Sequence, residues 1–203
     1  MKDNATIFRI SRESLKGKWG LAIGTSVLYL LIVAGIQAIP KAGPLGSLII
    51  SGPFGLGLAM FSLSIVRNKD ASVNQLFEGF QNFGTALGAY LLSSLFTILW
   101  LLLLIVPGII AAISYAQTFY LLADNPGLSP MEAIDKSKAM MDGYKMQYFY
   151  MLLRFLGLML LCVLTLGIGL FWLIPYMQVT VATFYEELKA SQAGQEATAE
   201  AIV

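Results

Sequence analysis

The polar residues that interrupt the apolar segments are the first candidates for chemistry. Arg154 is a cation inside an apolar run, and Gln117 and Gln178 are amides, each two positions after a tyrosine, Tyr115 or Tyr176. A guanidinium binds a phosphate or carboxylate through paired hydrogen bonds, and amides and phenols both donate and accept. Polar groups inside a membrane mark substrate pathways or bound ligands. We therefore take these five side chains as candidate lipid or pathway contacts.

Each candidate has a purely structural alternative. The two glutamines can hydrogen-bond between helices and hold them together. An arginine at the centre of a bilayer costs at least about 2.5 to 3.5 kcal/mol. Arg154 follows Lys145 by about two turns, so its long side chain can also extend to the cytoplasmic headgroups.

Several other kinds of chemistry lack the residues that they need. The chain has no His and one cysteine, Cys162, within an apolar run. Histidine is the commonest general base and metal ligand, and the sequence has no Ser-His-Asp set, phosphate-binding glycine loop or metal-ligand cluster. We expect no enzyme, catalytic residue, metal or cofactor, and take Cys162 as a small apolar filler. A net charge of +1 gives no basic face for nucleic acid.

The elements that position these residues are apolar helices. Of the 203 residues, 57% are hydrophobic and only 12% are charged, about half the charge of a soluble domain. Four runs carry no charge, and they are 22, 25, 45 and 31 residues long: 19–40, 42–66, 79–123 and 155–185. About 20 apolar residues cross a bilayer, so the first two runs predict one helix each. The first is too long for a cleavable signal.

The two longer runs are each expected to fold back on themselves. Pro107-Gly108 divides the third run into helices at 84–106 and 108–123, because proline interrupts helical hydrogen bonds and glycine permits a sharp turn. The segment 165–169 divides the fourth run, if its first helix includes residues 148–153. The sequence therefore predicts an all-α polytopic membrane protein with six transmembrane helices in three hairpins.

The positions of the basic residues predict the orientation. With six spans, 11 of the 13 Lys and Arg residues lie on the side of the termini; Lys41 lies opposite and Arg154 lies within a span. The positive-inside rule then places both termini in the cytoplasm.

Each hairpin is preceded by a polar-apolar segment that ends in glycine, at Gly17, Gly79 or Gly143. We expect these segments to be amphipathic helices at the cytoplasmic interface, with N-caps at Ser72 and Ser129. The third helix carries the candidate interfacial residues Ile134, Lys136, Lys138 and Met141. The unit of one interfacial helix and one hairpin is expected to repeat three times, at about 5–70, 71–125 and 129–189, within a single domain 1–189. Residues 190–203 are expected to be a disordered polar tail.

Small residues recur along the predicted spans, and they let helix backbones approach. They include the candidate packing positions Ser51, Gly55, Gly84, Gly88, Gly108 and Ala112. We expect them to pack within one chain; a homodimer across these positions is the alternative.

Two segments carry a resemblance to a known family. Residues 106–145, which include "ADNPGLSPMEAIDKSK", and residues 164–188 resemble an uncharacterised family of bacterial integral membrane proteins, a domain of unknown function. That family is distantly similar to the membrane domain of some glycerophosphodiester phosphodiesterases. The resemblance implies a six-helix membrane fold in the bacterial cytoplasmic membrane and no established activity, and it carries over no catalytic residue.

These observations favour a non-enzymatic membrane protein that binds membrane lipid, or a cytoplasmic or membrane protein partner, through its cytoplasmic face. The alternative is a small carrier of an amphipathic or lipidic compound, with Arg154, Gln117 and Gln178 lining its pathway.

Overall fold

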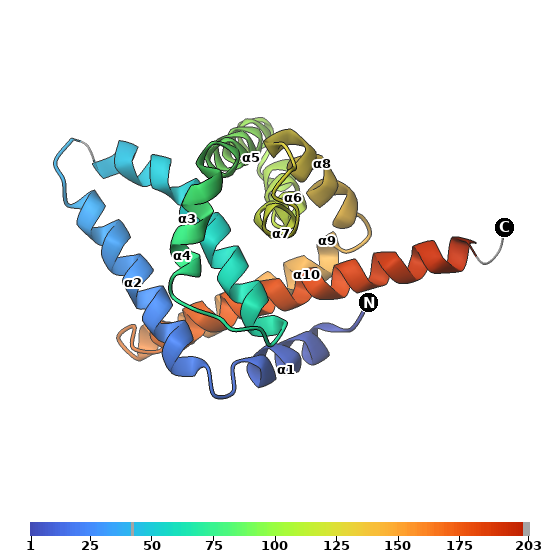
Figure 1. The fold of residues 1–203 in the computed structure, drawn as a ribbon, viewed down its shortest axis with the longest axis horizontal. Helices are drawn as coiled ribbons and strands as arrows, with labels where there is room; N and C mark the ends of the chain where they lie inside the picture. The colour runs from blue at the N-terminus through green and yellow to red at the C-terminus, as the bar shows by residue number, and fades with distance from the viewer. Residues whose placement is uncertain (42, 201–203) are drawn as a thin grey trace.

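The chain is helical throughout residues 1–41 and 43–200, the part that the computed structural model describes, apart from short turns and loops. In chain order the helices are α1 (Asn4–Ser14), α2 (Trp19–Gln37), α3 (Gly43–Val66), α4 (Gln75–Glu78), the 3-10 helix η1 (Gly79–Asn82), α5 (Phe83–Leu103), α6 (Ile105–Ser114), α7 (Thr118–Asp124), α8 (Pro130–Met140), α9 (Lys145–Leu164) and α10 (Leu170–Glu200). Helix α10 crosses the molecule and packs against α1, α2 and α3 (Figure 1).

Among the described residues, five helical segments are long and apolar enough to cross a membrane. They are α2, α3, Gln75–Leu103, Ile105–Asp124 and α9. The sixth predicted span lies in α10, where Gln178, Glu186 and Glu187 lower the mean hydropathy, and it is not among the five. The fold is therefore all-helical with five candidate spans, while six spans in three hairpins remain a prediction.

The chain reverses between α5 and α6 three residues earlier than predicted. Leu104 alone is extended, with φ −159° and ψ 144°, and α6 begins at Ile105. Pro107 lies in the first turn of α6, where a missing N–H costs no helical hydrogen bond, so the break precedes the proline. Gly108 lets the two helices touch: an added Cβ would lie 2.7 Å from the Leu101 Cα.

The predicted helix 108–123 is broken into α6 and α7, which the sequence did not indicate. At the break, the Gln117 backbone N–H donates to the Ser137 hydroxyl of α8 over 3.1 Å. That hydroxyl in turn donates to the Ser114 carbonyl over 2.8 Å. A residue from another helix therefore satisfies backbone groups that the break leaves free.

The predicted division of the last apolar run is confirmed at residues 165–169. Helix α9 ends at Leu164 and α10 starts at Leu170. Leu166 and Gly167 have left-handed φ values of 52° and 84°, and the Gly169 N–H donates to the Thr165 hydroxyl over 3.2 Å.

One of the two predicted N-caps is confirmed. Ser129 accepts from the Glu132 N–H, and the Glu132 carboxylate accepts from the Ser129 N–H, with Pro130 at the first position of α8. Ser72 is not a helix cap, because α4 begins only at Gln75. Its N–H donates instead to the Gln75 side chain over 3.3 Å.

The small residues pack within the chain at some predicted positions and not at others. An added Cβ at Gly55 would touch the Phe119 ring, and one at Gly88 would lie 2.9 Å from Pro130. An added Cβ at Gly84 would meet no side chain and no other segment within 4 Å in the described part of the chain. Gly57 of α3 approaches the Leu76 carbonyl more closely than Gly55 and Gly88 approach their neighbours. Ser51 donates to the Ser47 carbonyl of its own helix, and Ala112 lines a hollow between α5 and α6.

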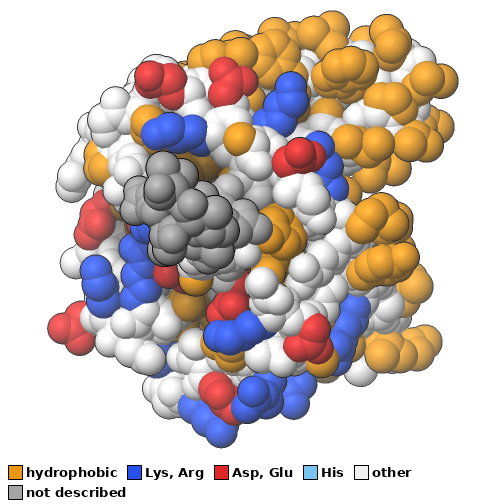
Figure 2. Space-filling view, turned by 90° about the vertical axis from the view of Figure 1, so that its right-hand side faces the viewer, with side chains coloured by type: hydrophobic (Ala, Val, Ile, Leu, Met, Phe, Trp, Pro, Cys, Tyr) orange, Lys and Arg blue, Asp and Glu red, His pale blue; other side chains and the backbone are white. Residues whose placement is uncertain are grey.

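Apolar and charged side chains separate on the surface. Figure 2 shows apolar side chains gathered along one edge, with the Lys, Arg, Asp and Glu side chains over the rest of this face. The last turn of α5 and the loop after α9 expose large apolar side chains, with Leu102 79% and Leu166 94% exposed. Continuous exposed apolar surface marks an interaction with protein or membrane.

Helix α10 extends into residues 190–203, the predicted polar tail, and the disorder of that tail stays a prediction. The helix runs without a break to Glu200. Residues 190–200 are rich in Ala, Gln and Glu, which are strong helix formers, and they continue a helix that is already nucleated. Residues 201–203 lie outside the described residues.

Candidate functional site

Arg154 does not stand alone in an apolar environment. It lies on α9, and its guanidinium carbon is 4.2 Å from the centroid of the Phe8 ring on α1. A guanidinium over an aromatic face gains a cation–π interaction. Helix α1 therefore contacts the Arg154 side chain of α9. The sequence analysis did not predict that α1 packs at this position.

A basic pocket surrounds this contact. It has a volume of about 230 Å³, and its charged lining consists of four cations and one carboxylate: Arg9, Arg12, Lys16, Arg154 and Glu13. Arg9 and Arg12 are three positions apart on one face of α1, and Lys16 follows the end of that helix. Glu13 neutralises little of this charge, because its ion pair with Arg9 is 3.8 Å long and both side chains are at least half exposed. The pocket therefore carries a net positive charge that suits an anion.

An apolar groove of about 350 Å³ adjoins the basic pocket, and both contain Arg12. Leu158, Leu161 and Cys162 of α9 form one wall of the groove. They follow Arg154 by four, seven and eight residues and so share its helix face. Arg12 therefore lies between a cationic pocket and an apolar groove.

Aromatic residues fix the junction between the pocket and the groove. The Tyr176 hydroxyl of α10 donates to the Phe8 carbonyl of α1 over 3.1 Å. The Phe155 ring meets both neighbours edge to face, with centroids 5.2 Å from Phe8 and 6.2 Å from Tyr176. Phe155 and Tyr176 are buried, so α1 is held rigidly on α9 and α10.

The predicted polar residues do not form a single site. Arg154 and Tyr176 lie at the pocket and groove just described, whereas Tyr115 is at the end of α6. Gln117 is fully buried, and neither atom of its side-chain amide has a hydrogen-bond partner in the described structure. Gln178 is partly exposed, and its backbone carbonyl accepts from the Tyr120 hydroxyl at 3.4 Å.

Helix α8 packs its apolar face against protein, whereas the sequence analysis assigned that face to the membrane interface. Ile134 and Met141 are 2% and 0% exposed, so protein covers them and they do not reach lipid. Lys136 and Lys138 are exposed. The buried face of α8 also includes Ser137, because this hydroxyl bridges the α6–α7 break.

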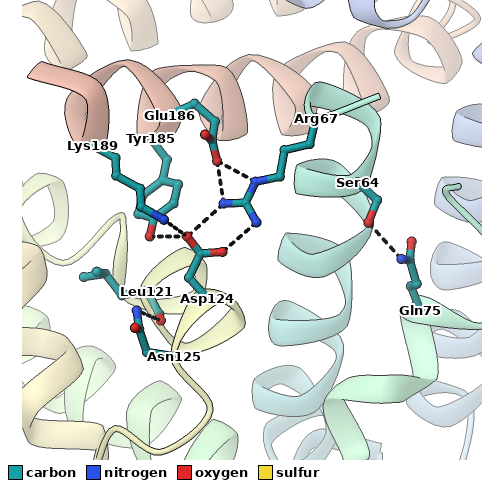
Figure 3. Close-up of polar contacts among 9 residues, drawn as sticks. All are labelled: Ser64, Arg67, Gln75, Leu121, Asp124, Asn125, Tyr185, Glu186 and Lys189. Atoms are coloured by element: carbon teal, nitrogen blue, oxygen red, sulfur yellow. Dashed lines mark hydrogen bonds and ion pairs between the residues drawn. The ribbon is translucent and has the colours of Figure 1, made fainter. Parts of the chain in front are cut away.

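A charge cluster that the sequence analysis missed joins three distant helices (Figure 3). Asp124, with a side chain 7% exposed, lies 2.7 Å from Arg67, which follows α3. Its Oδ2 also accepts from Lys189 at 2.7 Å and from the Tyr185 hydroxyl at 3.0 Å, both on α10. Arg67 makes a second ion pair with Glu186 at 2.6 Å. The signal in the sequence is that Asp124 is the only charged residue between Glu78 and Glu132.

The same contacts stabilise the protonated form of Arg67. Its hydrogen bond to Asp124 raises the pKa of the guanidinium above its ordinary value; burial opposes the shift, and the hydrogen bond to Glu186 adds to it. The cluster ties the ends of α3 and α7 to α10. Among the side chains that the structure describes, in residues 1–41 and 43–194, no three His, Cys, Asp or Glu gather as metal ligands.

Comparison with known proteins gives a family. One family model, described as "Protein of unknown function (DUF975)", matches residues 1–115 and 101–192. No curated protein and no solved structure matches the chain. The match confirms the resemblance to an uncharacterised family and does not address a similarity to phosphodiesterases. The chain belongs to the family of proteins of unknown function DUF975.

Proposed function

We propose that this is a six-span protein of the bacterial cytoplasmic membrane, with both termini in the cytoplasm, that binds an anionic phospholipid between α1, α9 and α10. The observation that carries the proposal is the basic pocket at Arg154, which shares Arg12 with the apolar groove. We propose no catalytic step, and the lipid is bound rather than converted.

The sixth span of the proposal is the first part of α10. It follows α9 across a short turn whose Leu166 and Ile168 are 94% and 60% exposed, as lipid-facing residues would be. An even number of spans returns the C-terminus to the side of α1. The concentration of Lys and Arg on that side supports a cytoplasmic orientation.

The dimensions of the site suit a phospholipid. Arg154 is nine residues into α9, about 14 Å from its start at 1.5 Å per residue. The groove continues from there along the same helix toward its far end. A phosphate bound by Arg154 and Arg12 would place an acyl chain against Leu158 and Leu161. Guanidinium groups suit this role because they bind phosphate through two parallel hydrogen bonds.

The carrier alternative finds less support. It requires Arg154, Gln117 and Gln178 to line one pathway, but Gln117 is fully buried beside α8 and Arg154 faces α1.

The test is native mass spectrometry of the protein released from nanodiscs that contain phosphatidylglycerol or only phosphatidylcholine. We expect wild type to retain phosphatidylglycerol and the Arg154→Ala variant to retain one fewer molecule. The matched control is Lys136→Ala, which removes an exposed cation of α8 that lines neither the pocket nor the groove. Equal retention by wild type and Arg154→Ala would refute the site.

A further inference from the structure

The junction between α1 and α2, which borders the proposed lipid site, has a close counterpart between α8 and α9. Gly17 and Gly143 have φ values of 77° and 78°. The backbone hydrogen bonds around these glycines also correspond. In the first junction, the Lys16 N–H donates to the Glu13 carbonyl and the Lys18 N–H to the Leu15 carbonyl. In the second, the Asp142 N–H donates to the Ala139 carbonyl and the Tyr144 N–H to the Met141 carbonyl. Helices α1 and α8 are each 11 residues long. The two junctions are therefore the same local structure at two places in the chain.

The hairpins that face these junctions also correspond. Gly169 and Gly108 lie near the starts of α10 and α6, and each meets the residue seven positions earlier: an added Cβ would lie 2.6 Å from the Cys162 Sγ or 2.7 Å from the Leu101 Cα. A tyrosine follows each glycine by seven positions, Tyr176 or Tyr115. Each tyrosine lines a hollow next to its own hairpin.

The hollow lined by Tyr115, Lys138 and Lys145, here called the second groove, combines cations with an apolar wall, as the basic pocket and the apolar groove do together. Its volume is about 210 Å³, and Trp100, Ile110 and Tyr115 give it an apolar wall. Its cations are Lys138 and Lys145. Lys138 lies five positions before Gly143, just as Arg12 lies five positions before Gly17. A cation therefore occupies the same structural position in both grooves.

The two lysines are available to an anion. Lys138 makes no ion pair in the described part of the chain, and Lys145 has only a 3.6 Å contact with Asp142, whose side chain is 84% exposed. An exposed pair of this kind contributes little. Two cations beside an apolar wall complement a phosphate attached to an acyl chain, and a lysine near anionic lipid contributes about fivefold in binding.

The third counterpart position is closed. Phe54 lies 61 residues before Tyr115, the same interval that separates Tyr115 from Tyr176. Its ring packs edge to face on Phe80, with centroids 5.0 Å apart, and it is 3% exposed. Asn74 lies five positions before Gly79, where the other two junctions carry the cations Arg12 and Lys138. The local backbone differs as well, because Gly79 has φ −59°. The correspondence therefore yields two open grooves.

We propose that the groove of Lys138, Lys145 and Tyr115 is a second site for an anionic phospholipid, quasi-equivalent to the site at Arg154. This inference rests on the proposed function, since it assigns the same ligand class to both grooves. A chain embedded in an anionic membrane then holds two lipids at fixed positions, one beside α9–α10 and one beside α5–α6.

The test counts the phosphatidylglycerol molecules retained after release from nanodiscs. We expect two for wild type, one for Arg154→Ala, one for Lys138→Ala/Lys145→Ala and none for the combination. Retention at the second groove should fall about 25-fold in the double lysine variant, at about fivefold for each lysine. Lys136→Ala, next to these positions on α8, should retain two, and Lys138→Arg should retain the second lipid.

The outcomes separate the two proposals. Loss of one lipid in Arg154→Ala but no change in the double lysine variant would overturn the second site and leave the first. Loss only in the lysine variant would overturn the first. If the double variant does not fold, Ile110→Trp fills the groove instead; Ile110 is 46% exposed, so its backbone need not move. Two lipids retained in Ile110→Trp would overturn the second site.

Discussion

Removing the Asp124 carboxylate should destabilise the protein more than any surface substitution. Asp124 is 7% exposed and faces Arg67, Lys189 and Tyr185. Removing one partner of a buried ion pair costs about 3 to 5 kcal/mol. Arg67 is 26% exposed and keeps Glu186, and Lys189 is 54% exposed, so both retain solvation or a partner. We therefore expect Asp124→Ala to lower the free energy of unfolding by about 2 to 3 kcal/mol.

The assay is thermal unfolding in detergent, followed by the far-UV circular dichroism of wild type and variant. A loss of 2 to 3 kcal/mol corresponds to a fall in Tm of roughly 4 to 12 °C for a chain of this size. Asp142→Ala is the matched control, because its pair with Lys145 spans 3.6 Å and its side chain is 84% exposed; its Tm should change by less than about 2 °C. If Asp124→Ala unfolds within the same 2 °C, the cluster does not hold α3, α7 and α10 together and the reasoning fails.

Three further predictions concern the packing of the helices. Ser137→Ala removes two buried hydrogen bonds at the α6–α7 break, so it should cost about 1 to 3 kcal/mol in the same thermal assay; an unchanged Tm would show that the break holds without this bridge. Gly57→Ala places a Cβ against the Leu76 carbonyl and should destabilise by about 1 to 3 kcal/mol or more. Gly84→Ala, its control in open space, should be neutral or stabilising by about 0.4 to 1 kcal/mol; equal effects of the two would contradict the close approach of α3 and α4. Hydrogen bonds from Ser129 lower the pKa of the Glu132 carboxyl. The stability that ionised Glu132 contributes is therefore fully present above the ordinary carboxyl pKa and is lost as pH falls through the lowered pKa. Glu132→Gln should therefore flatten the acid side of a Tm–pH profile; an identical acid slope in both proteins would rule out this contribution.

The helical breaks that depend on local chemistry were predictable from the sequence. Leu166 and Gly167 adopt left-handed backbone within the predicted 165–169 segment, and Pro107 marks the α5–α6 reversal to within three residues. The α6–α7 break was not predictable in this way, because it depends on a hydroxyl that α8 contributes from 20 residues away.

The candidate site was predictable only in part. Arg154 is visible as a charge within an apolar run, but its pocket depends on how α1 packs on α9. The amphipathic pattern of α8 predicted the burial of Ile134 and Met141 but assigned them to lipid, because a periodic pattern does not say whether protein or membrane covers the apolar face. The partners of Asp124 lie 57 to 65 residues away, beyond the reach of any local rule.

The position of Cys162 makes the first groove directly observable. It is the only cysteine in the chain, and its side chain lines the groove beside Leu158 and Leu161. A thiol-reactive fluorophore or spin label would therefore attach to the native sequence at one defined place, with no background cysteine to remove. The reaction rate of the Cys162 thiol, measured with and without phosphatidylglycerol, would report whether lipid occupies the groove in the intact membrane. The measurement needs no introduced cysteine.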